Sequence, residues 1–409
     1  MNTCFKKGIS LWTDYSCLFI IIALLVPNFA KSQCFQNPQG QFVTVDGSPC
    51  VSTIITAVPF LRIAPDARTS GMGDAGIAIS ADASALHYNA SKLVFAENKT
   101  GFGLTYTPWL RAANFGYLSL AYGSSYFQFN EKNAIGLGIR YFSLGEVDFT
   151  NLNGIPVGNA KPHELEFNAS FAKKLSTRFS GGLGLKYIYS SLASGQVING
   201  ETITAGTSIA MDVSFTYQTP SITIGLAITN LGQKLTYTNS VNKTFIPGNI
   251  GIGIAWNKQV HENKLMLTMD INKLLVPTSD PAGIDINGDT IADYKQRSYL
   301  PSILGSFSDA PDGFSEELRE LTFSFGAELQ LQDFIALRAG YFHEHSTKGN
   351  RKYLTTGLGF TYKFITFNGS YLITTTKQEN PLDNTFRLGL SFNFGQLNNV
   401  NNNKTSDRK

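Results

Sequence analysis

Apolar and polar residues alternate with a period of two along most of the chain after residue 98. In the segment FRLGLSFNF, which covers residues 386–394, the apolar residues hold every second position: Phe386, Leu388, Leu390, Phe392 and Phe394. Side chains of a β-strand point alternately to opposite faces, whereas a helix repeats about every 3.6 residues. The pattern therefore predicts a strand with one apolar face.

The same alternation predicts about fourteen strands with no helix between them. They cover residues 99–107, 113–122, 133–143, 164–173, 178–190, 205–218, 221–231, 247–257, 264–275, 320–331, 334–343, 353–363, 365–374 and 386–394. A tilted strand of about 9–11 residues crosses a bilayer. We therefore expect an all-β protein that forms a transmembrane antiparallel β-barrel. A soluble β-sandwich with one polar face is the alternative.

The predicted connections alternate between short and long along most of the chain. Tight turns are expected at 219–220, 332–333 and 363–364, and long connections at 143–163, 190–204, 231–246, 276–319 and 375–384. Outer-membrane barrels have short periplasmic turns and longer surface loops. An even number of strands also returns both ends of the barrel to one side. We therefore expect an outer-membrane protein with periplasmic termini and with its long loops at the cell surface.

Eight charged residues inside the predicted strands lie on the face opposite the apolar series. They are Arg140, Glu166, Lys186, Asp212, Asp270, Glu328, Arg338 and Arg387. A base that faces lipid at the middle of the membrane costs about 2–4 kcal/mol. The charged face is therefore expected to line the lumen, where mixed signs predict ion pairs and not a single-sign selectivity ring.

Composition agrees with a membrane barrel and argues against nucleic acid as a partner. Charged residues make up 15% of the 409 residues, aromatic residues make up 12%, and the formal net charge is only +3. Soluble domains average about 25% charged residues. Because acids and bases nearly balance, the chain lacks the positive field that phosphate binding needs.

The first 32 residues resemble a secretory signal. Lys6 and Lys7 precede an apolar run at 18–26, and Ala30-Lys31-Ser32 provides a small-x-small cleavage site. A membrane-anchoring helix is the alternative, but the run is short of the ~20 residues that a span requires. We expect a signal peptide at 1–32, an N-terminal arm and plug at 33–98, a barrel at 99–394 and a polar tail at 395–409.

Two cysteines remain after signal removal, Cys34 and Cys50. In an oxidising compartment such a pair favours a structural disulfide, and two free thiols are the alternative. Gln33 stands where a lipoprotein signal has a small residue, which argues against lipidation of Cys34.

The segment ARTSGMGDAGIAISADASALHYNASKL, residues 67–93, is rich in glycine and alanine. Such a segment packs its backbone closely and offers polar groups such as Asp74 and Asn89 to a charged wall. A barrel of about fourteen strands is too wide for its own side chains to fill. We therefore predict that the segment plugs the lumen. As a flexible linker it would leave Ile77, Ile79 and Leu86 in water.

Residues 59–93 resemble the N-terminal region of the PorV (LptO) outer-membrane proteins of the type IX secretion system, which are similar to FadL-type barrels of fourteen strands. The markers are Arg62, Pro65-Asp66-Ala67-Arg68, Gly71-Met72-Gly73-Asp74-Ala75-Gly76, Asp82 and Asn89. FadL-type proteins often have Asn-Pro-Ala where this chain has Asn89-Ala90-Ser91, which leaves that turn open.

The resemblance implies a carrier with no known catalytic activity. Proteins of this kind lie in the lipid of the outer membrane. From a SprA/Sov-type translocon they collect cargo that bears a C-terminal signal domain, and they deliver this cargo to a PorU-type sortase. The alternative is a FadL-like transporter of hydrophobic small molecules. An outer-membrane hydrolase is disfavoured because no nucleophile motif is present.

The longest connection, residues 276–318, contains a partial calcium-loop pattern. Asp285, Asn287, Asp289 and Asp293 stand at relative positions 1, 3, 5 and 9, but Thr290 replaces the usual Gly and Gln296 the usual Glu. Calcium and an Asx-rich turn both remain open. Because the loop also carries many apolar residues, we expect it to dock a protein partner or to form a lid over the barrel mouth.

Overall fold

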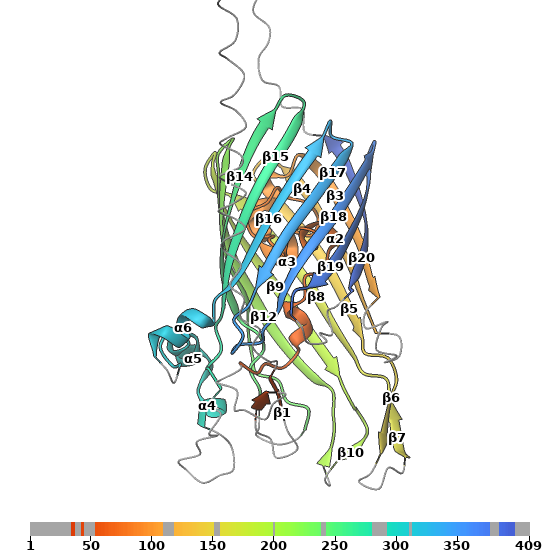
Figure 1. Cartoon of the computed structure of the whole chain (residues 1–409), viewed down its shortest axis with the longest axis vertical. Coiled ribbons are helices and arrows are strands. Elements are labelled where there is room, and N and C mark those ends of the chain that lie inside the picture. The colour runs from red at the N-terminus through yellow and green to blue at the C-terminus, as the bar shows by residue number, and fades with distance from the viewer. Residues whose placement is uncertain are drawn as a thin grey trace, which may run out of the picture.

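The computed structural model describes residues 34–36, 42–44, 54–108, 118–150, 156–198, 201–238, 243–279, 293–310, 313–376 and 384–396. Fourteen antiparallel strands form one closed barrel (Figure 1). They are β3 (Asn98–Pro108), β4 (Ser119–Asn130), β5 (Asn133–Ser143), β8 (His163–Lys174), β9 (Phe179–Ser191), β12 (Gly206–Gln218), β13 (Ile222–Gly232), β14 (Asn249–Val260), β15 (Asn263–Leu274), β16 (Thr322–Leu331), β17 (Ile335–His343), β18 (Lys352–Tyr362), β19 (Ile365–Thr374) and β20 (Phe386–Gln396). The predicted barrel is confirmed, and β20 pairs with β3 to close it.

The second predicted strand is misplaced by several residues. It was expected at 113–122, whereas β4 covers Ser119–Asn130. The outward positions of β4 include Gly123 and Ser125, so the apolar alternation is weak where the strand runs. The shift leaves only Glu131 and Lys132 between β4 and β5. The alternation of short and long connections therefore extends to the first hairpin as well.

The barrel has a short-turn end and a long-loop end. The short-turn end holds the connections 131–132, 175–178, 219–221, 261–262, 332–334 and 363–364, and the long-loop end holds all others between barrel strands. The long-loop end also carries the hairpins β6 (Val147–Thr150)–β7 (Pro156–Ala160) and β10 (Val197–Ile198)–β11 (Glu201–Thr202). Three short helices, α4 (Asp293–Gln296), α5 (Tyr299–Gly305) and α6 (Phe314–Arg319), lie on the β15–β16 connection at this end (Figure 1).

None of the helices among the described residues has both the length and the hydropathy needed to cross a membrane.

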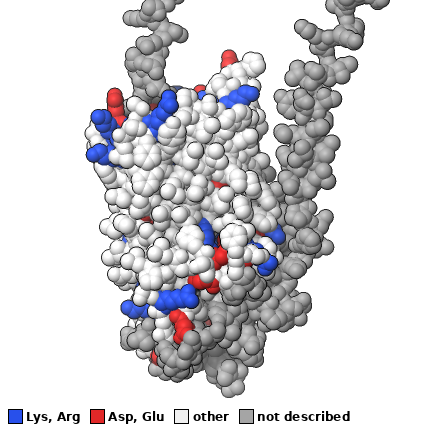
Figure 2. Space-filling view, turned by 90° about the vertical axis from the view of Figure 1, so that its left-hand side faces the viewer, with Lys and Arg blue, Asp and Glu red and all other residues white. Residues whose placement is uncertain are grey.

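The wall is apolar outside and polar inside, as the alternation predicts. Large apolar side chains such as Leu137, Leu183 and Leu358 are exposed on the outer face. The eight strand charges expected in the lumen are all buried. On the face drawn in Figure 2, Lys, Arg, Asp and Glu gather toward the two ends, and most of the wall between them is uncharged. An apolar belt between two polar ends is the surface that a bilayer requires.

The segment before the first barrel strand lies inside the barrel. It contains the short helices η1 (Pro59–Arg62), α2 (Ala67–Ser70), α3 (Ala85–Tyr88) and η2 (Ala90–Phe95). Its start is at the long-loop end, where the Ala57 amide donates to the Phe245 carbonyl oxygen at 2.8 Å. Its end is near the β4–β5 turn, where Gln128 Nε2 donates to the Leu93 carbonyl oxygen at 2.7 Å. The segment therefore runs lengthwise through the lumen, as a plug.

An apolar cluster holds the start of the plug at the long-loop end. Val58, Phe60 and Leu61 are buried against side chains near the ends of several strands, among them Leu120, Phe142, Ile188, Leu235 and Ile246. The ring of Phe60 stacks on that of Phe142 with centroids 6.3 Å apart. Burying a side chain of this size contributes about 1.5–3 kcal/mol.

The described start of this segment and the end of β20 therefore lie at opposite ends of the barrel. The expectation that the two chain termini share one side concerns residues outside the described ranges, and it stays a prediction. An even number of strands places only the start of the first barrel strand and the end of the last one on the same side. In this chain, residues 54–96 cross the lumen once before the first barrel strand. The hairpin β1 (Cys34–Gln36)–β2 (Phe42–Thr44) also appears at the long-loop end in Figure 1.

This course through the lumen can be tested with single cysteines in a variant that lacks Cys34 and Cys50. Ile55→Cys and Lys161→Cys, both at the long-loop end, are expected to react with an impermeant maleimide from the same side of the membrane. Glu262→Cys, in the β14–β15 turn, is expected to react from the other side. Labelling of Ile55→Cys together with Glu262→Cys would contradict the lengthwise course.

Candidate functional site

The strongest contact between plug and wall is a shared carboxylate. Arg68 of α2 donates to Glu328 of β16 through Nε at 3.1 Å and through Nη2 at 2.9 Å. Arg338 of β17 donates to the same carboxylate at 2.6 Å, and Arg68 also pairs with Asp82 at 2.9 Å. Two-point guanidinium–carboxylate bonds are among the strongest hydrogen bonds in proteins. One buried acid therefore ties the plug to the wall.

The sequence around Arg68 explains why this residue is placed so well. The side chain of Asp66 caps α2 by accepting a hydrogen bond from the Thr69 amide at 2.9 Å. Asp is a preferred N-cap residue because its oxygen satisfies an amide that has no partner within the helix. The cap fixes the single helical turn from which Arg68 reaches the wall.

A second anchor binds the plug backbone directly. The carboxylate of Asp270, on β15, accepts hydrogen bonds from the Gly76 and Ile77 amides at 2.7 and 2.8 Å. Lys92 Nζ donates to the Gly76 carbonyl oxygen at 2.6 Å. Asp270 therefore binds main-chain amides of the plug, and Lys92 binds a carbonyl oxygen of the same plug turn.

Glycines allow the plug backbone to touch the wall. A Cβ added to Gly340 of β17 would lie 2.1 Å from the Gly73 nitrogen. Gly73 itself has a φ of +66°, in the left-handed region that favours glycine. The Gly73 amide donates to Thr355 Oγ1 at 2.8 Å. The Gly-Met-Gly-Asp run is therefore a turn that packs directly on strand backbone.

The turn Asn89-Ala90-Ser91 is fixed by side-chain hydrogen bonds. Asn89 Nδ2 donates to the Ile77 carbonyl oxygen at 3.0 Å and to Thr216 Oγ1 at 2.9 Å. Ser91 Oγ donates to Asn89 Oδ1 at 2.6 Å. These bonds hold the turn where FadL-type proteins often have Asn-Pro-Ala.

The predicted luminal ion pairs connect four neighbouring strands. Arg140 Nε lies 3.2 Å from Glu166 Oε2, and Lys186 Nζ lies 2.8 Å from Asp212 Oδ2 and 3.7 Å from Glu166 Oε1. Arg140 also donates to the Phe60 carbonyl oxygen at 3.1 Å. This second network therefore holds the start of the plug as well as the wall.

A small cavity remains between plug and wall, toward the long-loop end. Its volume is about 130 Å³, and charged and amide side chains contribute to its lining. They include Arg62, His87, Asn230, Asp270, Glu344 and Arg351. A water molecule occupies about 30 Å³, so the space suits a few waters.

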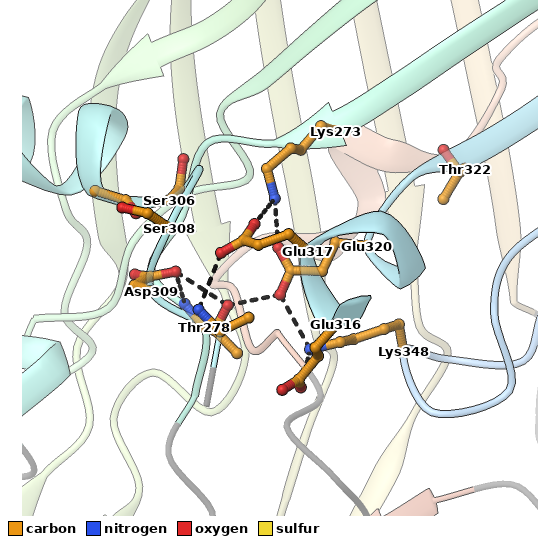
Figure 3. Close-up of polar contacts among 12 residues, drawn as sticks. Lys273, Thr278, Ser306, Ser308, Asp309, Glu316, Glu317, Glu320, Thr322 and Lys348 are labelled. Carbon is orange, nitrogen blue, oxygen red and sulfur yellow. Dashed lines mark hydrogen bonds and ion pairs between the residues drawn. The ribbon is translucent and has the colours of Figure 1, made fainter. Parts of the chain in front are cut away.

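A buried charge cluster fixes α6 to the rim of the barrel (Figure 3). Lys273 Nζ contacts Glu317 at 2.8 Å and Glu320 at 2.5 Å. Lys348, in the β17–β18 connection, contacts Glu316 at 2.6 Å and Glu320 at 3.0 Å. Three acids and two lysines are thus paired where two connections meet. We call these five residues the rim cluster.

A neighbouring ion pair fixes the end of η1. Glu344 accepts from Arg62 Nη2 at 3.0 Å and from Arg351 at 2.8 and 2.9 Å. Burial favours a raised pKa for Glu344, but the two guanidinium groups outweigh it and hold the pKa below its usual value. Likewise, burial favours a raised pKa for Glu320, but hydrogen bonds from Lys273 and Thr278 and the charge of Lys348 lower it. Both carboxylates are therefore ionised at neutral pH.

The structure brings together few of the site residues predicted from sequence. Asp285, Asn287 and Asp289 lie outside the described residues, and Asp293 begins α4. Cys50 also lies outside them, whereas Cys34 pairs with Thr44 in the β1–β2 hairpin. Within the part of the chain that the structure describes, no three His, Cys, Asp or Glu side chains are grouped as metal ligands. The calcium loop and the disulfide stay predictions.

Sequence analysis missed the rim cluster and the Arg62–Glu344–Arg351 pair. A signal was present in FSEELRE, residues 314–320, where acids alternate with apolar residues at helical spacing. Their partners could not be assigned, because both are distant in sequence: Lys273 lies in β15, and Lys348 lies on the β17–β18 connection.

A family model described as type IX secretion system protein PorV matches residues 49–281, more than half of the chain. A search of curated proteins gives no match. The solved CymD monoaromatic hydrocarbon channel is similar at 13% identity and a TM-score of 0.50, covering 81% of this chain and 97% of that chain. The Ralstonia pickettii toluene transporter TbuX is similar at 13% identity and a TM-score of 0.49, covering 80% and 98%. Likeness at such identities concerns the fold alone.

Replacing the shared carboxylate is expected to loosen the plug. Glu328→Gln leaves two buried guanidinium groups without their common partner, which costs about 3–5 kcal/mol of unfolding free energy. A cysteine at the buried position Ala78 should then react faster with a bulky maleimide. Asp333→Asn, in the exposed pair with Lys264, is the control and should cost about 0–1 kcal/mol. Equal losses in both variants would show that Glu328 does not hold the plug.

The lowered pKa values of Glu320 and Glu344 predict acid sensitivity at the rim. A carboxylate with a depressed folded pKa contributes stability above its unfolded pKa, about 4.3, and loses it as pH falls through the folded value. Hydrogen exchange of α6 and of the 344–351 connection should therefore accelerate below about pH 4, before that of β18 and β19. In Glu320→Gln the response of α6 should be flatter. An unchanged response in that variant would exclude Glu320 as the sensitive group.

Proposed function

Because the chain belongs to the PorV family of type IX secretion system proteins, we propose that it carries cargo at the outer membrane. In this proposal it collects cargo that bears a C-terminal signal domain from a SprA/Sov-type translocon. It then delivers the cargo to a PorU-type sortase. Its work is binding and transfer between partners, and no catalytic step is assigned to the chain.

The observation that carries this proposal is the filled lumen. The plug is tied to the wall by Arg68–Glu328–Arg338, by the Asp270 carboxylate and by close contact between Gly73 and Gly340. The cavity between plug and wall described above measures about 130 Å³, far less than a folded cargo domain occupies. Cargo is therefore handled outside the bore, and the long loops offer the largest surface for it.

We further propose that the long-loop end faces the cell surface. Short turns on one side and long loops on the other are typical of outer-membrane barrels, whose short turns are periplasmic. In this orientation the start of the plug and the connection between β15 and β16 also face outward. Both would then lie where translocon, sortase and cargo meet.

The β15–β16 connection remains a candidate for docking a protein partner. The described helices α5 and α6 lie at the rim, and the barrel mouth beside them is already filled by residues such as Val58 and Phe60. Because these residues already close the barrel mouth, a lid formed by the connection would have little left to cover. We keep the docking role for this connection, including Asp285, Asn287 and Asp289 at its centre, as a proposal.

The alternative function is a FadL-like transporter of hydrophobic small molecules. The barrel fold favours it, because a solved hydrocarbon channel has a similar fold. The charged groups of the small cavity argue against it, because Glu344, for example, is already paired with Arg62 and Arg351, and a path for a ligand would have to separate such buried pairs. Transport would also require the ion pairs of the plug to separate.

A deletion strain separates the two functions. Loss of most signal-bearing proteins from the surface proteome, with normal growth on fatty acids and hydrocarbons, is the result expected of a carrier. The wild-type gene and Asp333→Asn should restore display. A chain with residues 280–310 replaced by a short Gly/Ser linker should insert normally, judged by heat-modifiable migration, yet copurify several-fold less translocon or sortase. A selective growth defect on hydrophobic carbon sources with a normal surface proteome would favour the transporter.

A further inference from the structure

The helices α5 and α6 are amphipathic in an inverted sense. In α5, Leu300 and Leu304 are 72% and 76% exposed, whereas Ser302 is buried. In α6, Phe314 is 76% exposed, whereas Glu316 is fully buried. Helices on the surface of a soluble protein turn their apolar side toward the core. Here the polar side faces the protein and the apolar side faces outward.

The buried polar side is held by the outer face of the wall. Lys273 has the same strand parity as Leu267 and Ile271 of β15, whose side chains point away from the lumen. Glu317 and Glu320 cover its ammonium group (Figure 3). The ring of Phe307 lies 5.8 Å from the same nitrogen. The rim cluster therefore fixes α6 at the rim, with Lys273 on the outer side of the wall and with Glu320 and Lys348 also lining the small luminal cavity.

The exposed apolar side continues the lipid-facing surface of the barrel. In Figure 1, α5 and α6 lie beside the wall and outside the ring of strands, at the long-loop end. The two strands that this connection joins expose Leu267 on β15 and Phe325 on β16 along the outer wall. We call Leu300, Leu304, Phe307, Phe314 and Leu318 the rim apolar patch; all five are at least half exposed. The patch and the apolar wall thus form one surface at the edge of the bilayer.

The charges around the rim apolar patch are mostly basic on the outside. Lys295 and Arg297 are exposed, and Arg319 is half-buried. The three glutamates of α6 and its C-cap point into the rim cluster. Of the other acids among the described residues of this connection, Asp293 is half-buried, and Asp309 pairs with Arg297 at 3.1 Å. Leu and Phe on one side with Lys and Arg around them are typical of helices that lie in an anionic membrane interface.

We propose that α5 and α6 lie in the outer leaflet of the membrane that holds the barrel. The rim apolar patch is inserted at the boundary between headgroups and acyl chains, and Lys295, Arg297 and Arg319 face anionic phosphate headgroups. The continuity of the patch with the lipid-facing wall favours lipid over a protein as the occupant. The assignment to the outer leaflet rests on the proposed orientation of the barrel, whereas the contact with lipid does not depend on the cargo function and adds to any contact with a partner.

The test places an environment-sensitive fluorophore on single cysteines in the full chain, without Cys34 and Cys50, in lipid nanodiscs with no other protein. Leu304→Cys and Phe314→Cys report on the patch. Leu267→Cys on the lipid-facing wall is the positive control, and Lys161→Cys on the exposed β7–β8 connection is the negative control. Lipids that carry a quencher near the headgroup or deep in the acyl chain measure contact and depth.

Both patch positions are expected to be quenched several-fold more than Lys161→Cys, and more by the shallow quencher than by the deep one. Quenching should increase in discs with anionic lipid, and Lys295→Gln with Arg297→Gln should remove that increase. In Glu317→Gln with Glu320→Gln, which loosens the base of α6, quenching should fall while barrel migration on gels stays normal.

Quenching at the level of Lys161→Cys in discs of either composition would overturn the proposal. The rim apolar patch would then be a surface for a protein partner and not for lipid. Equal quenching by both lipid compositions, unaffected by the two basic substitutions, would overturn the assigned role of the basic residues.

Discussion

The structure depends on the pairing of charges that the barrel turns inward. A barrel of fourteen strands has a lumen too wide for its own side chains to fill, and an unpaired ion in such a space is costly. The plug solves both problems, because its backbone fills the space and its groups complete the pairs. Glu328 would serve only Arg338 without Arg68, and Asp270 would lose the two amides that it binds. Wall and plug therefore share one core, in which these polar contacts lie between buried apolar clusters.

This arrangement reverses the usual division of a protein into apolar interior and polar surface. The wall is apolar outside, and the interior is held by ion pairs and by glycine contacts such as Gly73 with Gly340. The same reversal recurs at the rim, where α6 turns its acids toward Lys273 and Lys348 and its apolar side outward. In both the barrel wall and α6, the apolar side chains face outward and the charged side chains face the protein.

Much of the fold could be predicted from the sequence, because a period of two is a local signal. It located thirteen of the fourteen barrel strands to within a few residues and gave the correct facing of all eight luminal charges. It failed at β4, where Gly123 and Ser125 weaken the apolar series. The candidate site was less predictable, because its contacts join distant segments. Nothing local to Arg62 indicates Glu344 as its partner, and nothing local to Lys273 indicates α6. The number of strands also does not reveal that the N-terminal segment crosses the lumen.

The lengthwise course of that segment sets an order of events in folding. The last strand, β20, closes the barrel by pairing with β3, which directly follows the plug. Once this seam has formed, the remaining cavity is far too small for a chain to be drawn through the lumen. Residues 54–96 therefore have to be in position while the sheet is still open, and the strands wrap around them. The plug thus acts as a template for assembly of the wall, and pairing of β20 with β3 is the final step.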